Sequence, residues 1–146
     1  MKQILIFIAL MCTLTVNAQS KLEKEQKAVK ENGFKYLRAY NLDFSQKTTY
    51  STSYVFTSQS TYLIKVDNCD VMIEVYDSEK RLITSNYVSQ EKRCLNAISI
   101  KCYKSGVYQI KYSLRKSSAE KDFISVIGFK TSASTQNFNI AALSKM

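Results

Sequence analysis

The sequence predicts a mostly β protein with antiparallel sheets, preceded by one helix near its N-terminus. From Tyr50 onward, apolar and polar residues alternate in short runs, and this period of two is typical of strands with one buried and one solvated face. Turn-forming residues separate the runs, as in Asp67-Asn68 and Lys104-Ser105-Gly106. Short strands at this spacing favour a two-sheet sandwich or a barrel over a parallel α/β fold.

The first 18 residues have the form of a secretory signal peptide. Lys2 precedes an apolar run over residues 4–11, and small and polar residues then lead to an expected cleavage point after Ala18. The apolar run is shorter than the roughly 20 residues that a membrane-spanning helix needs. We therefore expect an exported protein, periplasmic or secreted, without a transmembrane segment.

Residues 19–47 are predicted to form a helix followed by a connector. The sequence Ser20-Lys21-Leu22-Glu23 matches a capping box, in which the serine and the glutamate satisfy free amides of the first helical turn. Gly33 is expected to end or bend the helix, and residues 41–47 to connect it to the β domain. An apolar stripe, which predicts packing on one edge of the domain, consists of Leu22, Ala28, Val29, Tyr36 and Leu37.

The β-sandwich domain is expected to span residues 48–130. The alternating runs cover residues 50–56, 61–66, 71–76, 98–103 and 108–114. Residues 123–129 would place apolar side chains on both faces of a strand, which predicts a central or doubly covered strand. Residues 115–122 are predicted to be a polar surface loop, and residues 131–146 a loosely held polar tail.

The charge of the chain is basic, but its distribution does not indicate a nucleic-acid-binding surface. The chain of 146 residues has 21 Lys and Arg against 12 Asp and Glu, and removal of the first 18 residues, with Lys2, leaves 128 residues and a net charge of +8. Such a charge would suit nucleic acid, phospholipid or an acidic glycan. However, the lysines are scattered without interleaved aromatic residues, so we expect no nucleic-acid partner and a generally basic surface.

Three segments in order resemble the bacterial pre-peptidase C-terminal domain. They are TYLIKV, VMIEVYDSEKRLITSN and AISIKCYKSGVYQIKYS, within residues 49–130. The resemblance implies a jelly-roll-like β-sandwich, usually an accessory module beside secreted peptidases that aids substrate binding, solubility or secretion. No peptidase accompanies the module here, so the chain is most similar to small, stand-alone exported members found in Bacteroidetes-type bacteria.

The three cysteines after the predicted cleavage point suggest one disulfide and one free thiol. An oxidising compartment favours such pairing, whereas the absence of histidine and of Cys-x-x-Cys spacing argues against structural zinc. In some members of the resembled family the cysteine equivalent to Cys102 pairs with one at the start of the last strand, which this chain lacks. The resemblance therefore implies a buried free thiol at Cys102 and a disulfide between Cys69 and Cys94.

One polar corner raises the possibility of a structural calcium site. Asp67, Asn68 and Asp70, with Asp77 one strand away, carry the oxygen ligands that calcium prefers, and some members of the resembled family bind calcium. The stretch lacks the glycine and the acidic spacing of a dedicated calcium loop, however, and Asp and Asn are common turn formers. A plain turn is the main interpretation, with calcium as the alternative and no other cofactor expected.

Tyrosines are the remaining candidates for ligand contact. Tyr87 and Tyr103 lie outside the inward-facing phases of the strands and could stack on a sugar or a partner's apolar surface. Isolated exposed rings are also common on proteins without such a role. Core positions are expected for Tyr50, Tyr54, Tyr62, Tyr108 and Tyr112.

Catalysis is not indicated by any motif. Without histidine a Ser-His-Asp or Cys-His device is excluded, and neither a Gly-x-Ser-x-Gly elbow nor a glycine-rich phosphate loop is present. We therefore expect a non-catalytic exported module that binds a protein or a glycan at the cell envelope. The alternatives are a structural or adhesion component that assembles, for example through its helix, and an unrecognised hydrolase.

Overall fold

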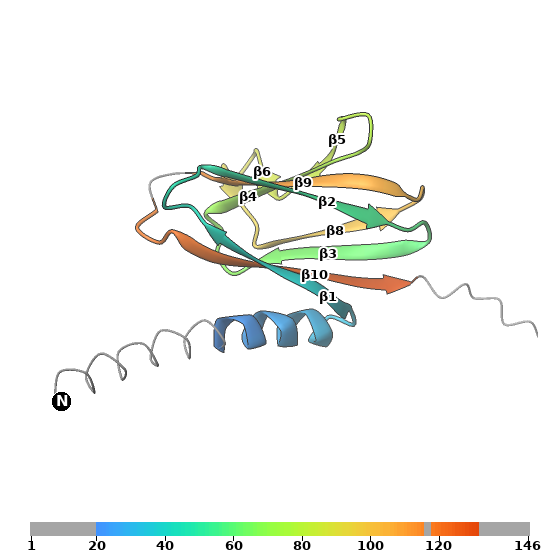
Figure 1. The fold of residues 1–146 in the computed structure, drawn as a ribbon, viewed down its shortest axis with the longest axis horizontal. Helices are drawn as coiled ribbons and strands as arrows, with labels where there is room; N and C mark the ends of the chain where they lie inside the picture. The colour runs from blue at the N-terminus through green and yellow to red at the C-terminus, as the bar shows by residue number, and fades with distance from the viewer. Residues whose placement is uncertain (1–19, 116–117, 132–146) are drawn as a thin grey trace, which may run out of the picture.

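The computed structural model describes residues 20–115 and 118–131, which form a helix and two packed β-sheets (Figure 1). The helix covers residues 20–31. The strands are β1 (Lys35–Asp43), β2 (Thr49–Phe56), β3 (Ser60–Val66), β4 (Val71–Tyr76), β5 (Leu82–Ser85), β6 (Tyr87–Val88), β7 (Arg93–Cys94), β8 (Ala97–Cys102), β9 (Gly106–Leu114) and β10 (Asp122–Thr131).

The strand order confirms a β-sandwich and identifies it as a jelly roll. One sheet, here called sheet A, has the order β1-β10-β3-β8, and the other, sheet B, has the order β2-β9-β4-β5. All pairs are antiparallel, and β6 and β7 form a separate small hairpin. Apart from the hairpin of β4 and β5 and the small β6–β7 hairpin, successive strands alternate between the two sheets, in the double Greek-key pattern of jelly rolls. The alternative of a barrel is thereby excluded, and the fold class that the sequence predicted is confirmed.

The core lies between the two sheets and is built by the inward-facing residues of the alternating runs. Val71, Ile73 and Val75 of β4 are fully buried, whereas the residues between them are half-buried. At the centre, the Ser125 hydroxyl of sheet A donates a hydrogen bond of 2.9 Å to the Tyr112 hydroxyl of sheet B. Burial raises the pKa of Tyr112, so this phenol stays neutral and links the sheets without a charge.

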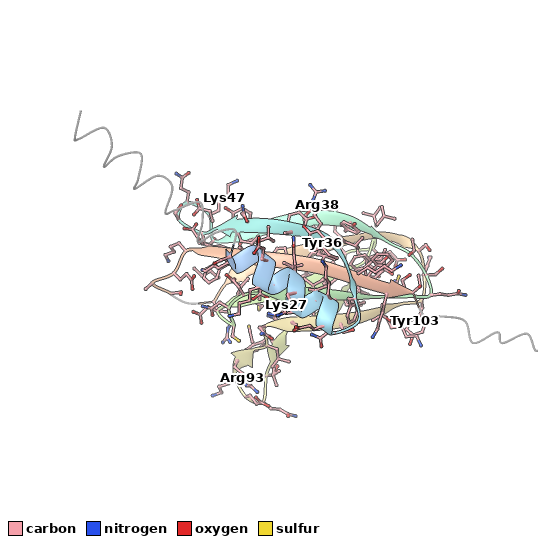
Figure 2. The ribbon with its side chains drawn as sticks, turned by 90° about the horizontal axis from the view of Figure 1, so that it is seen from below. Lys27, Tyr36, Arg38, Lys47, Arg93 and Tyr103 are labelled. Atoms are coloured by element: carbon pink, nitrogen blue, oxygen red, sulfur yellow. The ribbon has the colours of Figure 1, made fainter. Side chains whose placement is uncertain are left out.

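The helix covers the outer face of sheet A, as Figures 1 and 2 show from two directions. Val29 of the helix is fully buried against Leu63, Ile124 and Val126 in a second apolar cluster. This packing explains why β10 is buried along both faces, and it confirms the prediction of a doubly covered strand.

The sequence prediction for residues 19–47 was wrong in two respects. Gly33, which has a φ of 76°, ends the helix as expected, but the chain then forms strand β1 where the apolar stripe continued to Leu37 and a connector was predicted. In addition, the helix lies on a face of sheet A and not on an edge of the domain. Strand β1 forms through a long-range contact, because it is the second neighbour of β10 in sheet A. In their register, Lys35 lies opposite Phe129 and Asp43 opposite Asp122.

The remaining sequence predictions on the fold concern burial and the chain ends. Tyr62 and Tyr112 are buried, and the partly buried Tyr50, Tyr54 and Tyr108 pack against the core, as expected. The predicted signal peptide and nearly all of the predicted polar tail lie outside the described residues. In the described part of the chain, no helix has the length and apolar character that crossing a membrane requires.

Gly128 of β10 lies directly under Val29 of the helix, where a larger side chain has no room. A Cβ atom at this position would lie 2.5 Å from Cγ1 of Val29 and 3.1 Å from Cβ of Phe34. Gly128→Ala is therefore expected to force the helix away from the sheet and to lower the free energy of unfolding by about 1–3 kcal/mol, measured by urea denaturation. Gly106→Ala is the matched control, because a Cβ at Gly106 would meet nothing within 4 Å. Equal stabilities of the two variants would contradict this account of helix docking.

Candidate functional site

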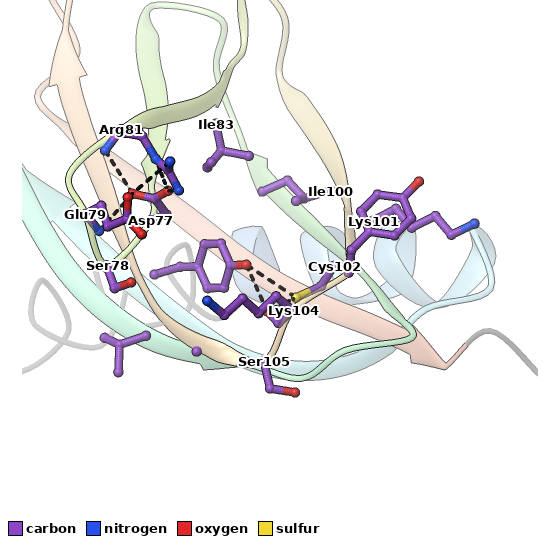
Figure 3. Close-up of a pocket in the computed structure, with 14 residues that line it drawn as sticks. Asp77, Ser78, Glu79, Arg81, Ile83, Ile100, Lys101, Cys102, Lys104 and Ser105 are labelled. Carbon is purple, nitrogen blue, oxygen red and sulfur yellow. Dashed lines mark hydrogen bonds and ion pairs between the residues drawn. The ribbon is translucent and has the colours of Figure 1, made fainter.

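A groove lies where the edge strands β5 and β8 of the two sheets face each other, between the β4–β5 and β8–β9 turns (Figure 3). Its volume is about 250 Å³. It is lined by residues 77–79, Arg81, Ile83 and residues 100–108. Two segments that lie about twenty residues apart in the sequence therefore form the groove, and each segment contains a hairpin turn.

One wall of the groove is the β4–β5 turn, which is held by Asp77. Its Oδ1 accepts hydrogen bonds of 2.9 Å from the backbone N–H groups of Glu79 and Arg81, and its Oδ2 pairs with the Arg81 guanidinium at 2.8 Å. These contacts, led by the Arg81 N–H, lower the pKa of Asp77 below its ordinary value. Glu79 Oε2 also lies 3.1 Å from the same guanidinium, so the turn presents two carboxylates that share Arg81, as Figure 3 shows.

The other wall is the β8–β9 turn, which is fixed by contacts with its own backbone. The Tyr108 hydroxyl donates to the Lys104 carbonyl at 2.9 Å, and the buried Cys102 thiol donates to the same oxygen at 3.1 Å. Burial raises the pKa of Tyr108. Ser105 Oγ accepts a hydrogen bond of 2.8 Å from the Ser58 N–H of the β2–β3 turn, which ties the two turns together.

Stacked aromatic rings support this wall from within. The Phe56 ring stacks on Tyr62 and on Tyr108, with centroid separations of 4.0 and 4.9 Å. Stacked pairs of large rings are favourable beyond the area they bury. These three rings form the floor beneath the β8–β9 turn.

Tyr103 stands on this turn with its ring in solvent. Its side chain is 81% exposed, more than any other exposed large hydrophobic residue described, and the Lys101 ammonium lies 5.5 Å from its ring centroid. Two further exposed apolar residues, Ile83 and Val107, also line the groove. Neither Lys101 nor Lys104 forms an ion pair within the described ranges. The site therefore offers a free aromatic face, apolar side chains and two ammonium groups.

The other tyrosine that the sequence singled out, Tyr87, lies elsewhere. It belongs to the β6–β7 hairpin, is half-buried, and has the Arg115 guanidinium 4.4 Å from its ring centroid. Its ring is thus already covered by a side chain of the same molecule. The structure does not bring Tyr87 and Tyr103 together in one site.

The predicted calcium ligands do not form one cluster either. Asp70 and Asp77 flank opposite ends of β4, and a strand of six residues is about 20 Å long, so the inclusion of Asp77 was wrong. Asn68 Oδ1 accepts the Asp70 N–H at 3.0 Å, which is the hydrogen bond of a simple turn. Among the described residues, no three His, Cys, Asp or Glu side chains gather as a metal site.

Asp67 has a structural task of its own in that corner. Its Oδ1 accepts the Ile124 N–H of β10 at 3.0 Å, and its Oδ2 lies 3.7 Å from the Lys21 ammonium of the helix. Burial raises the pKa of Asp67 in spite of these contacts. The carboxylate thus joins the β3–β4 turn to β10 and to the helix.

The three cysteines within residues 20–131 are free thiols in this structure. Cys102 is buried in the core, as the family resemblance implied, whereas Cys69 is exposed and Cys94 is buried. Burial raises the pKa of Cys94, and neighbouring Cys69 contributes to the same effect. Arg115 donates to Cys94 Sγ at 3.9 Å and, through its backbone N–H, to the carbonyl of Asp70, the residue after Cys69, at 3.0 Å, so the two cysteines lie in one neighbourhood. Their pairing as a disulfide stays a prediction.

Sequence reasoning selected Tyr103, and it selected Asp77 only as a calcium ligand, but it missed the rest of the groove. Lys101 and Lys104 flank Tyr103 in the sequence, and this cluster beside the Ser105-Gly106 turn was the available signal. The opposite wall, with Asp77, Arg81 and Ile83, gave no such signal, because only the folded sheets bring it near Tyr103.

Comparisons with known proteins give a likeness in fold and no family. No family model matches the chain, and no curated protein matches it. Among solved structures, the chain is similar to that of Aeromonas hydrophila PliG, a periplasmic lysozyme inhibitor of g-type lysozyme. The TM-score is 0.47 at 13% sequence identity, and the match covers 68% of this chain and 90% of that one.

Proposed function

We propose that the protein is an exported, non-catalytic binding module that takes a protein or a glycan of the cell envelope at the groove between β5 and β8. The observation that carries this proposal is Tyr103, a large ring 81% exposed on a turn whose Lys104 carbonyl accepts hydrogen bonds from Cys102 and Tyr108. A ring in solvent contributes little to the stability of its own fold. It does provide an exposed aromatic surface for a partner.

The groove also indicates what chemistry it would recognise. A tyrosine face stacks on the apolar side of a sugar ring or packs in the centre of a protein interface, where tyrosine is enriched. The ammonium groups of Lys101 and Lys104 would add charge-assisted hydrogen bonds to carboxylates or hydroxyls. A partner with acidic groups beside a flat or apolar surface fits both features.

The experiment is a thermal-shift screen of residues 19–146 against muropeptides, an anionic polysaccharide and purified envelope proteins, because a ligand that binds only the folded state raises the melting temperature. For each probe that binds, Tyr103→Ala is expected to weaken the affinity by about thirtyfold, the effect of removing a hot-spot ring. Titration calorimetry gives the dissociation constants.

Tyr36→Ala is the matched control, because Tyr36 is also exposed but lies on β1, away from the groove (Figure 2). It should leave the affinity unchanged. A probe whose affinity falls with Tyr36→Ala and not with Tyr103→Ala would place the binding site elsewhere and overturn the proposal.

Two further proposals from the sequence have different support. Membership of the pre-peptidase C-terminal family is supported by the jelly-roll strand order that the resemblance implied. Assembly through the helix is not supported, because Val29 and the apolar side of the helix are used against sheet A of the same molecule. A structural or adhesion role would therefore need another interface.

A further inference from the structure

Strand β2 differs from the other three edge strands of the sandwich. It has eight residues without a charge, and its register with β9 runs from Thr49 to Phe56 without a shift. By contrast, β1 has charged residues and a register shift, β5 has only four residues and a register shift, and β8 carries Lys101. Charges, irregular pairing and short length are the usual means by which sheet edges avoid pairing with other chains. In β2 all three are missing.

The sequence of β2 is also symmetric. Residues 50–54 read Tyr-Ser-Thr-Ser-Tyr, a palindrome centred on Thr52. The side chains at 49, 51, 53 and 55 are exposed, and those at 50, 52 and 54 are half-buried. Two antiparallel copies aligned at Thr52 would therefore match in sequence and in the face to which each side chain points.

We propose that two copies of this chain associate through β2, antiparallel and about a two-fold axis at Thr52, so that their B sheets become one continuous sheet. In this register Ser51 lies opposite the partner's Ser53, and Tyr50 lies opposite the partner's Tyr54. Hydroxyl pairs and aromatic pairs are favourable cross-strand neighbours, and the free backbone groups of both edges become hydrogen-bonded.

A second copy is the occupant that the symmetry favours. A two-fold interface requires a surface complementary to itself, and a palindromic strand meets that condition in antiparallel pairing. The basic charge of the chain does not oppose the contact locally, because β2 is uncharged and Lys111 on the adjacent β9 is paired with Glu74 at 3.5 Å. Val55, which is 61% exposed, would pack beside the partner's Thr49.

The proposed dimer is independent of the binding groove. In sheet B, β2 and β5 are opposite edges, so pairing through β2 leaves the groove beside β5 open in both copies. Failure of the one proposal consequently says nothing about the other.

The test is the mass in solution of residues 19–146 and of two double variants, measured by sedimentation equilibrium up to high micromolar concentration. The wild type is expected to dimerise. Ser51→Lys/Ser53→Lys places lysine opposite lysine twice across the axis and should raise the dimer dissociation constant about tenfold. Ser51→Lys/Ser53→Glu uses the same positions but places lysine opposite glutamate, so the dimer should persist.

Gln109→Lys on the interior strand β9 controls for added charge on the same sheet, and it should leave the dimer intact. A monomeric wild type would overturn the proposal. A dimer whose dissociation constant is unchanged in Ser51→Lys/Ser53→Lys would also overturn it. The same holds for a dimer that both double variants weaken equally, because the predicted register requires the two variants to differ.

Discussion

Replacing Asn86 by alanine is expected to lower the free energy of unfolding by about 3 kcal/mol or more, because three buried hydrogen bonds lose one partner each. Asn86 is 1% exposed at the corner after β5. Its Oδ1 accepts the Ile73 N–H at 2.7 Å, and its Nδ2 donates to the carbonyl oxygens of Val71 and Leu95 at 2.9 and 2.7 Å. One amide thereby ties β4 to the segment that follows β7.

The geometry of this amide also predicts a pH-dependent result for Asn86→Asp. Aspartate would keep the acceptor for Ile73 but would direct its second oxygen at the carbonyl oxygens of Val71 and Leu95. Burial and these two dipoles would raise the pKa of the new carboxyl above its unfolded value. The loss of stability should therefore be largest at neutral pH and should shrink as the pH falls through the folded-state pKa, where the carboxyl becomes a neutral donor.

Both Asn86 predictions are measured by urea denaturation, near neutral pH and in mild acid. Asn96→Ala is the control, because Asn96 is exposed. Its backbone oxygen accepts a hydrogen bond from the Val66 N–H, and the substitution retains this oxygen. Its stability should change little at either pH. If Asn86→Ala unfolded at the same urea concentration as this control, the bracing role of the amide would be disproved.

The second large effect concerns the ion pair between Glu25 of the helix and Lys65 of β3. The two side chains are only 7% and 15% exposed, and the Lys65 ammonium donates directly to Glu25 Oε2. Removing one member leaves the other charge buried without its partner, so Glu25→Ala should lower the free energy of unfolding by about 3 kcal/mol.

A double variant distinguishes the charge from the packing. Glu25→Leu/Lys65→Met replaces both charges by apolar groups of similar size and should recover most of the stability lost in Glu25→Ala. The control is Glu31→Ala, which removes an exposed pair with Lys27 on the same helix and should cost less than about 0.5 kcal/mol. If Glu25→Ala were as mild as Glu31→Ala, the buried pair would not be what fixes the helix to the sheet.

The sequence predicted those parts of the fold that depend on local pattern. Alternation in β4 and β9 identified both strands, and the doubly apolar run in β10 predicted its central place. Strand β1 was missed because Tyr36 and Leu37 also fit a heptad, and because its partner in the sheet is β10, some ninety residues away in the chain. No local signal reports such a partner.

The candidate site was predictable only in part, for a related reason. Tyr103 stood out because it lies outside the inward phase of β8, but its groove is formed by a second turn that the sheets carry to it. Asp77 was assigned to the wrong corner because nearness in sequence was taken for nearness in space. An intervening strand of six residues places it at the other end of the sheet.

The position of β10 between β1 and β3 has a consequence for the biogenesis of the protein. Sheet A lacks a central strand until residues 122–131 are available, and β1 has no other neighbour in that sheet. A nascent chain that is shorter than this cannot close the sandwich, because the contacts that reward folding join its two ends. The sandwich therefore acquires its stability only after residues 122–131 have been synthesised and have paired with β1 and β3.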